Sequence, residues 1–159
     1  MFRLNKLTDY GLVVMQYLGG CSRTELHTTR ELIAATQLPS ATIVKILKAL
    51  LDRKLLISYR GIKGGYALAR CPSEISVAEI IEALEGPIGF TECATTPGYC
   101  LLEGTCGVQH NSHVISRALQ QTLEGITLSD LTTSLRLGTR TPGRGSALTA
   151  ITVGTGRVQ

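Results

Sequence analysis

Several features that would assign this chain of 159 residues to a familiar class are missing. No apolar run approaches the roughly eighteen residues that a membrane span needs. Residues 1–20 are interrupted by Arg3, Lys6 and Asp9, and no small-residue cleavage site follows, which argues against a signal peptide. Internal repeats are also absent. We therefore expect a cytoplasmic protein with no membrane partner.

The cysteines lack the patterns of a disulfide framework and of a zinc knuckle. Their number, five, is odd, and no two are spaced as C-x2-4-C. In a reducing compartment, clustered cysteines indicate a metal more often than a cross-link. Three of the five, Cys93, Cys100 and Cys106, fall within a single stretch between two helical patterns.

Charge is divided unevenly along the chain, although the net charge is only +4. Residues 23–70 carry nine Lys and Arg against three Asp and Glu, whereas residues 71–136 carry two against eight. This asymmetry indicates a nucleic-acid surface joined to a separate module that does not bind nucleic acid. A hydrophobic content of 43% suggests burial beyond that of a small monomer, which a dimer interface would supply.

The basic half predicts helix, helix, helix and hairpin in that order. The first helix has Thr8 as its expected N-cap and stops at Gly19-Gly20. A second begins at the capping box formed by Thr28 and Glu31, and a third follows Ser40, which we expect to cap it. "LLISYR", "GIKGG" and "YALAR" then predict strand, turn and strand. This is the order of a winged helix-turn-helix, and the fold class is mainly α.

In such a fold the start of the third helix enters the major groove and the hairpin lies along phosphates. The residues that we expect to contact DNA are Ser40, Thr42, Lys45, Lys48, Arg60 and Lys63. The alternative is an amphipathic helix pair whose lysines form an ordinary solvated face.

The acidic half predicts a helix from the capping box of Ser76 and Glu79 to Gly86-Pro87, and then the cysteine loop, Glu92–His110. A longer helix over 111–126 carries an apolar seam that a partner subunit's equivalent helix would cover. A short helix capped by Thr127 and Asp130 follows. From residue 137 the chain reads as a disordered tail, with Arg140, Arg144 and Arg157 as weak phosphate contacts at most. The predicted units are 1–72 for DNA binding, 73–136 for cluster binding and dimerisation, and 137–159 for the tail.

Three thiolates separated by gaps of six and five residues can wrap a soft metal centre. No base or orienting group suggests one of them as a catalytic nucleophile. Wide spacing in a reduced compartment is consistent with an iron–sulfur cluster. Spacing alone leaves zinc and structural cysteines open. Cys21 and Cys71 fit no ligand position and are expected to be small, partly buried hydrophobic residues.

Three motifs in the same order resemble the winged-helix regulators that include IscR and NsrR. These are "RLNKLTDYG", "YRGIKGGYALAR" and Cys93-x6-Cys100-x5-Cys106. More narrowly, "KLTDYGLVVM", "EALEGPIGFTEC" and "CGVQHN" are similar to the branch that regulates SUF-system iron–sulfur assembly. The resemblance covers residues 2 to about 135. It implies a homodimer that binds palindromic promoter DNA and holds one cluster, [2Fe-2S] or [4Fe-4S], on Cys93, Cys100 and Cys106.

The resemblance leaves the fourth ligand between two candidates. The histidine that the IscR branch carries three residues after its last cysteine is Gln109 here, and His110 follows it. If a helix began at Cys106, His110 would still share a face with that cysteine. In some NsrR-type members an aspartate in the first helix of the opposite subunit completes the site, and Asp9 matches it. Ser112 stands where many members of the branch have tryptophan.

The expected function is therefore that of a transcription regulator, not an enzyme, with no small-molecule substrate. We expect it to repress genes of cluster assembly according to iron–sulfur status. A nitric-oxide sensor of the NsrR type is one alternative, a non-regulatory iron–sulfur or zinc protein is a second, and a DNA-binding protein with no metal is a third.

Overall fold

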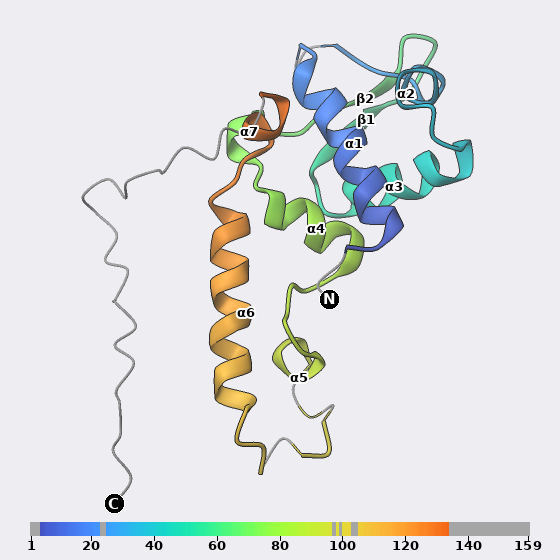
Figure 1. Cartoon of the computed structure of the whole chain (residues 1–159). Helices are drawn as coiled ribbons and strands as arrows, with labels where there is room; N and C mark the ends of the chain where they lie inside the picture. The colour runs from blue at the N-terminus through green and yellow to red at the C-terminus, as the bar shows by residue number, and fades with distance from the viewer. Residues whose placement is uncertain (1–3, 23–24, 97, 99, 103–104, 134–159) are drawn as a thin grey trace, which may run out of the picture.

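The computed structural model of the protein describes residues 4–22, 25–96, 98, 100–102 and 105–133 (Figure 1). The predicted tail, with its three arginines, lies outside the described residues. No helix in the described ranges is long and apolar enough to cross a membrane.

The first three helices are α1 (Lys6–Gly20), α2 (Thr29–Thr36) and α3 (Ser40–Asp52). The capping box predicted for α2 is confirmed, since Thr28 and Glu31 exchange side-chain and backbone hydrogen bonds. Two predicted caps are wrong. Asn5 caps α1, because its Oδ1 accepts the Thr8 N–H at 2.9 Å and Thr8 is already inside the helix. Pro39 occupies the N-cap position of α3, where no side chain caps the helix, and Ser40 is the first helical residue.

The predicted hairpin is the wing, with β1 (Leu56–Tyr59) and β2 (Gly65–Leu68) paired antiparallel. Gly61 has a φ of +118°, which favours glycine at this turn. A Cβ on Gly65 would lie 2.9 Å from the carbonyl oxygen of His27, so only glycine lets β2 approach this closely. His27 and Tyr66 then exchange two backbone hydrogen bonds of 2.9 Å, which fix the segment before α2 to the wing.

One hydrophobic core joins the basic half to the acidic half. Its largest fully buried side chains include Met15 of α1, Leu32 of α2, Ile46 of α3, Ile80 of α4 (Val77–Glu85) and Leu128 of α7 (Leu128–Thr132). The stripe predicted on α3 is buried at Ile43, Ile46, Leu47 and Leu50. Its lysines face solvent on the opposite side.

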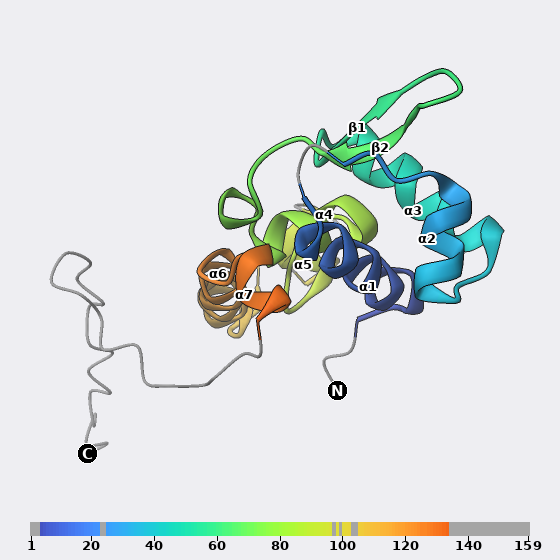
Figure 2. The same ribbon diagram turned by 90° about the horizontal axis from the view of Figure 1, so that it is seen from above.

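The acidic half contains the 3₁₀ turn η1 (Pro72–Glu74), α4 (Val77–Glu85), α5 (Glu92–Thr95), α6 (Gln109–Glu124) and α7 (Leu128–Thr132). Neither η1 nor α5 was predicted. α4 and α7 both pack against α1, whereas α6 runs away from the head along α4 and α5 (Figures 1 and 2). The segment between α5 and α6 therefore lies at the end of the molecule opposite the wing (Figure 1).

The chain that follows α6 is bonded to the start of α4, and a capping box lies on each side of this connection. The pairs Ser76–Glu79 and Thr127–Asp130 form as predicted. Between them, the Val77 N–H donates to the Ile126 carbonyl and the Leu128 N–H to the Ile75 carbonyl, both at 2.8 Å. Because these bonds are reciprocal, α6 and α4 are held together at this corner.

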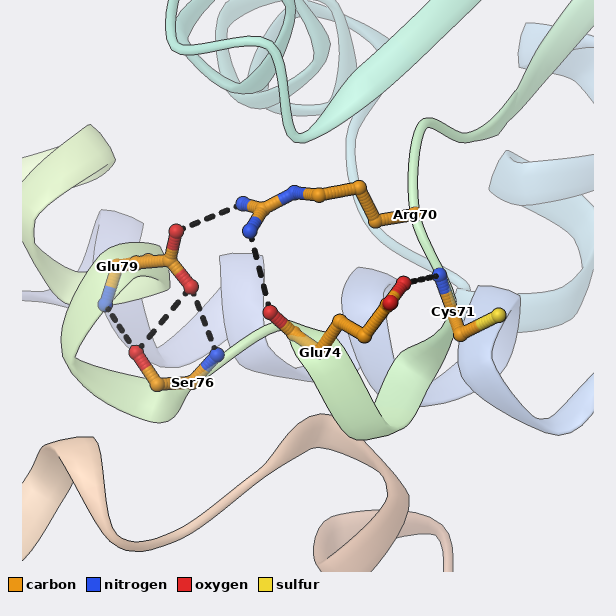
Figure 3. Close-up of polar contacts among 5 residues, drawn as sticks. All are labelled: Arg70, Cys71, Glu74, Ser76 and Glu79. Atoms are coloured by element: carbon orange, nitrogen blue, oxygen red, sulfur yellow. Dashed lines mark hydrogen bonds and ion pairs between the residues drawn. The ribbon is translucent and has the colours of Figure 1, made fainter.

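A polar network links the wing to the same corner (Figure 3). Arg70, two residues beyond β2, donates to Glu79 Oε1 at 2.7 Å and to the Glu74 carbonyl at 3.1 Å. Glu79 also accepts the Ser76 N–H at 2.9 Å. One carboxylate thus serves both the cap of α4 and the connection to the wing.

Candidate functional site

The three cysteines of the Glu92–His110 segment border one cavity of about 660 Å³. Cys93 lies within α5, Cys100 in the following loop, and Cys106 three residues before α6 begins. Leu101, Leu102 and Val108 supply apolar surface, and the remaining lining residues are Thr91, Glu92, Gln109 and Ser112. The structure therefore brings the three predicted ligands to a single site.

The wall of this cavity is held in place by two serines of α6. The Phe90 N–H donates to Ser116 Oγ at 2.9 Å, and Ser116 Oγ donates to the Ser112 carbonyl at 2.8 Å. Both serines are buried. Because both side chains are small, the segment that precedes α5 can lie directly on α6. Cys93, further along the chain, has its sulfur 3.2 Å from Thr91 Oγ1.

The donor set suits a soft metal centre, because three half-buried thiols are the ligands that iron–sulfur clusters use. No disulfide joins any of the five cysteines, all of which lie in the described ranges. The three sulfurs do not all lie within 4.8 Å of one another. Thiolates on a single tetrahedral ion with metal–sulfur bonds of about 2.3 Å would be about 3.8 Å apart.

The two candidates for the fourth ligand lie apart from the cavity within one subunit. Asp9 is exposed in the first turn of α1 and borders a separate cavity of about 630 Å³. His110 is exposed and does not line the cysteine cavity, whereas its neighbour Gln109 does. Because α6 begins at Gln109, Cys106 precedes the helix, and the shared-face argument for His110 loses its premise. Ser112 fills the position expected for tryptophan and lines the cavity itself.

The predicted DNA-binding side chains lie on the exposed surfaces of α3 and the wing. Ser40, Lys45 and Lys48 are exposed along α3, and Thr42 is half-buried. Arg60 and Lys63 are exposed in the turn of the wing, with Ile62 between them at 107% relative exposure. A fully exposed isoleucine flanked by two cations has the features of a wing tip that lies in a groove.

A cavity next to the exposed surface of the wing was not predicted from the sequence. A cavity of about 430 Å³ lies between the start of α2 and the wing, bordered by Thr28, Thr29, Tyr59 and Arg60 among others. Thr28, Thr29 and Arg60 bring two hydroxyl groups and one cation to this cavity, beside the start of α2. The capping box at Thr28 was the available signal, but its proximity to Arg60 depends on tertiary structure.

The fold is a winged helix-turn-helix, made of α2, α3 and the antiparallel wing. The cysteine cavity adds a candidate metal-binding segment to it. Residues 4–134 match the family Rrf2, described as iron-dependent transcriptional regulator. The chain belongs to this family.

The relatives support the same assignment. The transcriptional regulator NsrR of Oceanobacillus iheyensis is 33% identical over 132 residues, which cover 80% of this chain and 88% of that protein. NsrR of Bacillus subtilis is 25% identical over 130 residues, covering 81% and 89%. Among solved structures, CymR, the global cysteine regulator of B. subtilis, aligns with a TM-score of 0.65 at 25% identity, covering 83% of this chain and 97% of that one. IscR of T. potens shares the fold, with a TM-score of 0.63 at 23% identity over 82% and 85%.

The winged-helix fold and the regulator class are therefore confirmed, and the relatives are regulators rather than enzymes. The alternative of a non-regulatory iron–sulfur or zinc protein is set aside. The resemblance to the SUF branch remains a prediction, as does the boundary at residue 72.

Proposed function

We propose that the protein is a cytoplasmic, homodimeric transcription regulator that holds an iron–sulfur cluster on Cys93, Cys100 and Cys106. The observation that carries this proposal is the single cavity that all three cysteines border, in a member of a family described as iron-dependent. When bound, the cluster would supply a centre whose gain, loss or chemical attack reports iron–sulfur status. A [2Fe-2S] or a [4Fe-4S] centre would suit the donors, and iron content per chain distinguishes them.

The DNA partner would be a palindromic promoter. Ser40, Thr42 and Lys45 would meet base edges or adjacent phosphates at the start of α3, while Lys48 would contact phosphate. Arg60 and Lys63 would contact backbone or minor groove from the wing. In the dimer the two α3 helices would lie about one DNA turn, ~34 Å, apart.

The dimer would form through the outer face of α6. Val114 and Ile115 are 43% and 41% exposed, and Ala118 and Thr122 beside them face solvent as well. Leu119 and Leu123 of the predicted seam are half-buried on the inner side. A second α6 would cover the outer residues and place Asp9 of the opposite subunit as a candidate fourth ligand, with His110 as the other.

Cluster status would reach the DNA-binding head through α6 and α4. The middle of α6 is bonded through Ser116 to Phe90, just before the cysteine segment, and the chain after its C-terminal end is bonded to the start of α4 through Ile126 and Val77. Reordering of the cysteine segment would therefore shift α6, and the spacing of the two heads with it. We further propose that the regulated genes are those of SUF-type cluster assembly and that the protein represses them.

A nitric-oxide sensor of the NsrR type is the second candidate, favoured by the 33% identity to NsrR of O. iheyensis. Both candidates use the same ligands, because cluster iron is also where nitric oxide attacks. Promoter binding after exposure to nitric oxide, compared with binding after iron depletion, separates them.

Anaerobic purification tests the cofactor. The account expects a brown protein with visible absorbance, iron and sulfide, all lost in Cys93→Ser and retained in Cys71→Ser. A colourless wild-type protein that contains zinc would end the cluster proposal.

A further inference from the structure

A second group of metal-ligating side chains lies at the corner between α1 and α2, far from the cysteine cavity in sequence. Cys21 is the C-cap residue of α1, and Glu25 and His27 precede α2. The Cys21 sulfur, a Glu25 carboxylate oxygen and a ring nitrogen of His27 all lie within 4.8 Å of one another. No other three His, Cys, Asp or Glu side chains in the described ranges approach this closely.

His27 has an unmet hydrogen-bonding requirement inside the protein. Its side chain is only 5% exposed, and its Nε2 is buried without a hydrogen-bond partner, the one such side-chain atom that the described residues contain. The backbone is fixed by two hydrogen bonds to Tyr66, and the ring lies edge-on to Tyr17 with centroids 5.4 Å apart. Buried polar atoms without a hydrogen-bond partner are rare in folded proteins, so this nitrogen is available to a ligand.

The group is also reachable from solvent. Cys21 is half-buried and borders a cavity of about 530 Å³ together with Tyr17, Gly20, Thr36 and Thr132. Glu25 is exposed. An ion can therefore reach Cys21 and Glu25 from the surface.

We propose that Cys21, Glu25 and His27 form a second metal site, for a divalent transition-metal ion of the zinc type. Thiolate, imidazole and carboxylate are the three ligand types of zinc, whereas magnesium and calcium prefer oxygen alone. The ligand atoms of a tetrahedral zinc site are about 3.5 Å apart, so side-chain movements of about 1 Å would close the group. Three protein ligands leave the fourth position to water.

The site would fix the wing relative to α1. His27 pairs with Tyr66 of β2, and Cys21 ends α1, so an ion bound to both would join the two elements. Zinc is expected to raise the midpoint of thermal unfolding. Because the site shares no residue with the cysteine cavity, this inference does not depend on the iron–sulfur proposal.

Cobalt(II) is a suitable probe, since thiolate-bound cobalt absorbs in the visible and near-ultraviolet. The full chain would be titrated anaerobically as the variant Cys93→Ser/Cys100→Ser/Cys106→Ser, which removes the other thiolate group. We expect one equivalent of cobalt with thiolate absorption, and displacement by zinc. Adding Cys21→Ser should abolish the absorption, while Cys71→Ser, the matched control, should leave it unchanged.

Glu25→Gln provides a second variant, because Glu25 is exposed and its replacement does not disturb the core. Cobalt affinity should fall by at least the roughly 10- to 100-fold that loss of a supporting residue costs. His27→Gln should lose binding as well. The inference is overturned if the triple-cysteine variant shows no thiolate–cobalt absorption, or if the absorption persists after Cys21→Ser.

Discussion

The carboxylate of Glu79 shows how one side chain can serve two elements. Burial raises its pKa, but the hydrogen bonds from Ser76 and the contact with Arg70 outweigh burial, so the pKa lies below the ordinary value of 4.5. A carboxylate with a lowered pKa stabilises the fold above its unfolded-state pKa. That contribution is lost as the pH falls through the lower folded-state value.

Glu79→Gln should therefore lower the free energy of unfolding at pH 7 and have little effect at pH 3. The loss should stay below about 1 kcal/mol, because the side chain is 40% exposed and solvent screens the ion pair. Urea unfolding at both pH values measures it, with Glu82→Gln on the same helix as the control. A loss that is equal at both pH values would show that the charge of Glu79 is not the cause.

Lys45 and Arg60 should contribute to promoter binding through different contacts. If each neutralises one phosphate, replacement by alanine should reduce the slope of log affinity against log salt by about 0.9. Gel-shift titrations across salt concentrations measure the slope. Arg117→Ala on α6 removes one positive charge from the acidic half and should leave the salt slope unchanged. If the slope is also unchanged in Lys45→Ala and Arg60→Ala, the DNA-binding face lies elsewhere.

At the scale of helices and strands, the sequence predicts features, such as helix caps, that depend only on residues close together in the chain. The capping boxes at Thr28, Ser76 and Thr127 form as expected because both partners lie within four residues. The cap of α1 was misplaced by three residues, since the Thr8 N–H is bonded to the side chain of Asn5. The four-residue helix α5 is too short for a periodic signal.

Contacts between distant segments could not be predicted in this way. The cysteines were identified from their spacing, but the cavity wall made by Ser112 and Gln109 depends on where α6 begins. The group at Cys21, Glu25 and His27 was also missed. Its spacing matches no common metal motif, and the burial of His27 follows from the wing.

The bond from Phe90 to Ser116 should be the most sensitive connection of the cysteine segment. Ser116→Ala leaves the Phe90 N–H without its acceptor in a partly buried position and should cost about 1–3 kcal/mol. It should also speed loss of the cluster, measured from visible absorbance over time. Thr36→Ala on α2 removes a similar bond to a carbonyl one turn back and is the control, since it should not affect the cluster.

At the scale of the whole molecule, the dimer interface proposed on the outer face of α6 would determine whether one DNA-binding head or two can contact DNA. Ile115→Glu places a charge on the outer face of α6 and should convert the dimer to a monomer. The affinity for a palindromic site should fall as a result. Analytical ultracentrifugation measures the first effect. Gln120→Glu, at least about 120° around the helix from each residue of that face, should remain dimeric. A dimeric Ile115→Glu protein would place the interface on another surface.

The two proposed functional regions lie at opposite ends of the described structure, joined by α4 and α6 (Figure 1). In the proposed mechanism, cluster status at the cysteine segment changes DNA binding at α3 and the wing. Affinity for promoter DNA is the quantity that connects them.

The most direct measurement is therefore that affinity, taken on one anaerobic preparation before and after the cluster is removed, with visible absorbance followed in the same sample. The account predicts that affinity changes as the absorbance is lost, and that Cys106→Ser shows the affinity of the stripped protein from the start. An identical affinity with and without the cluster would contradict it.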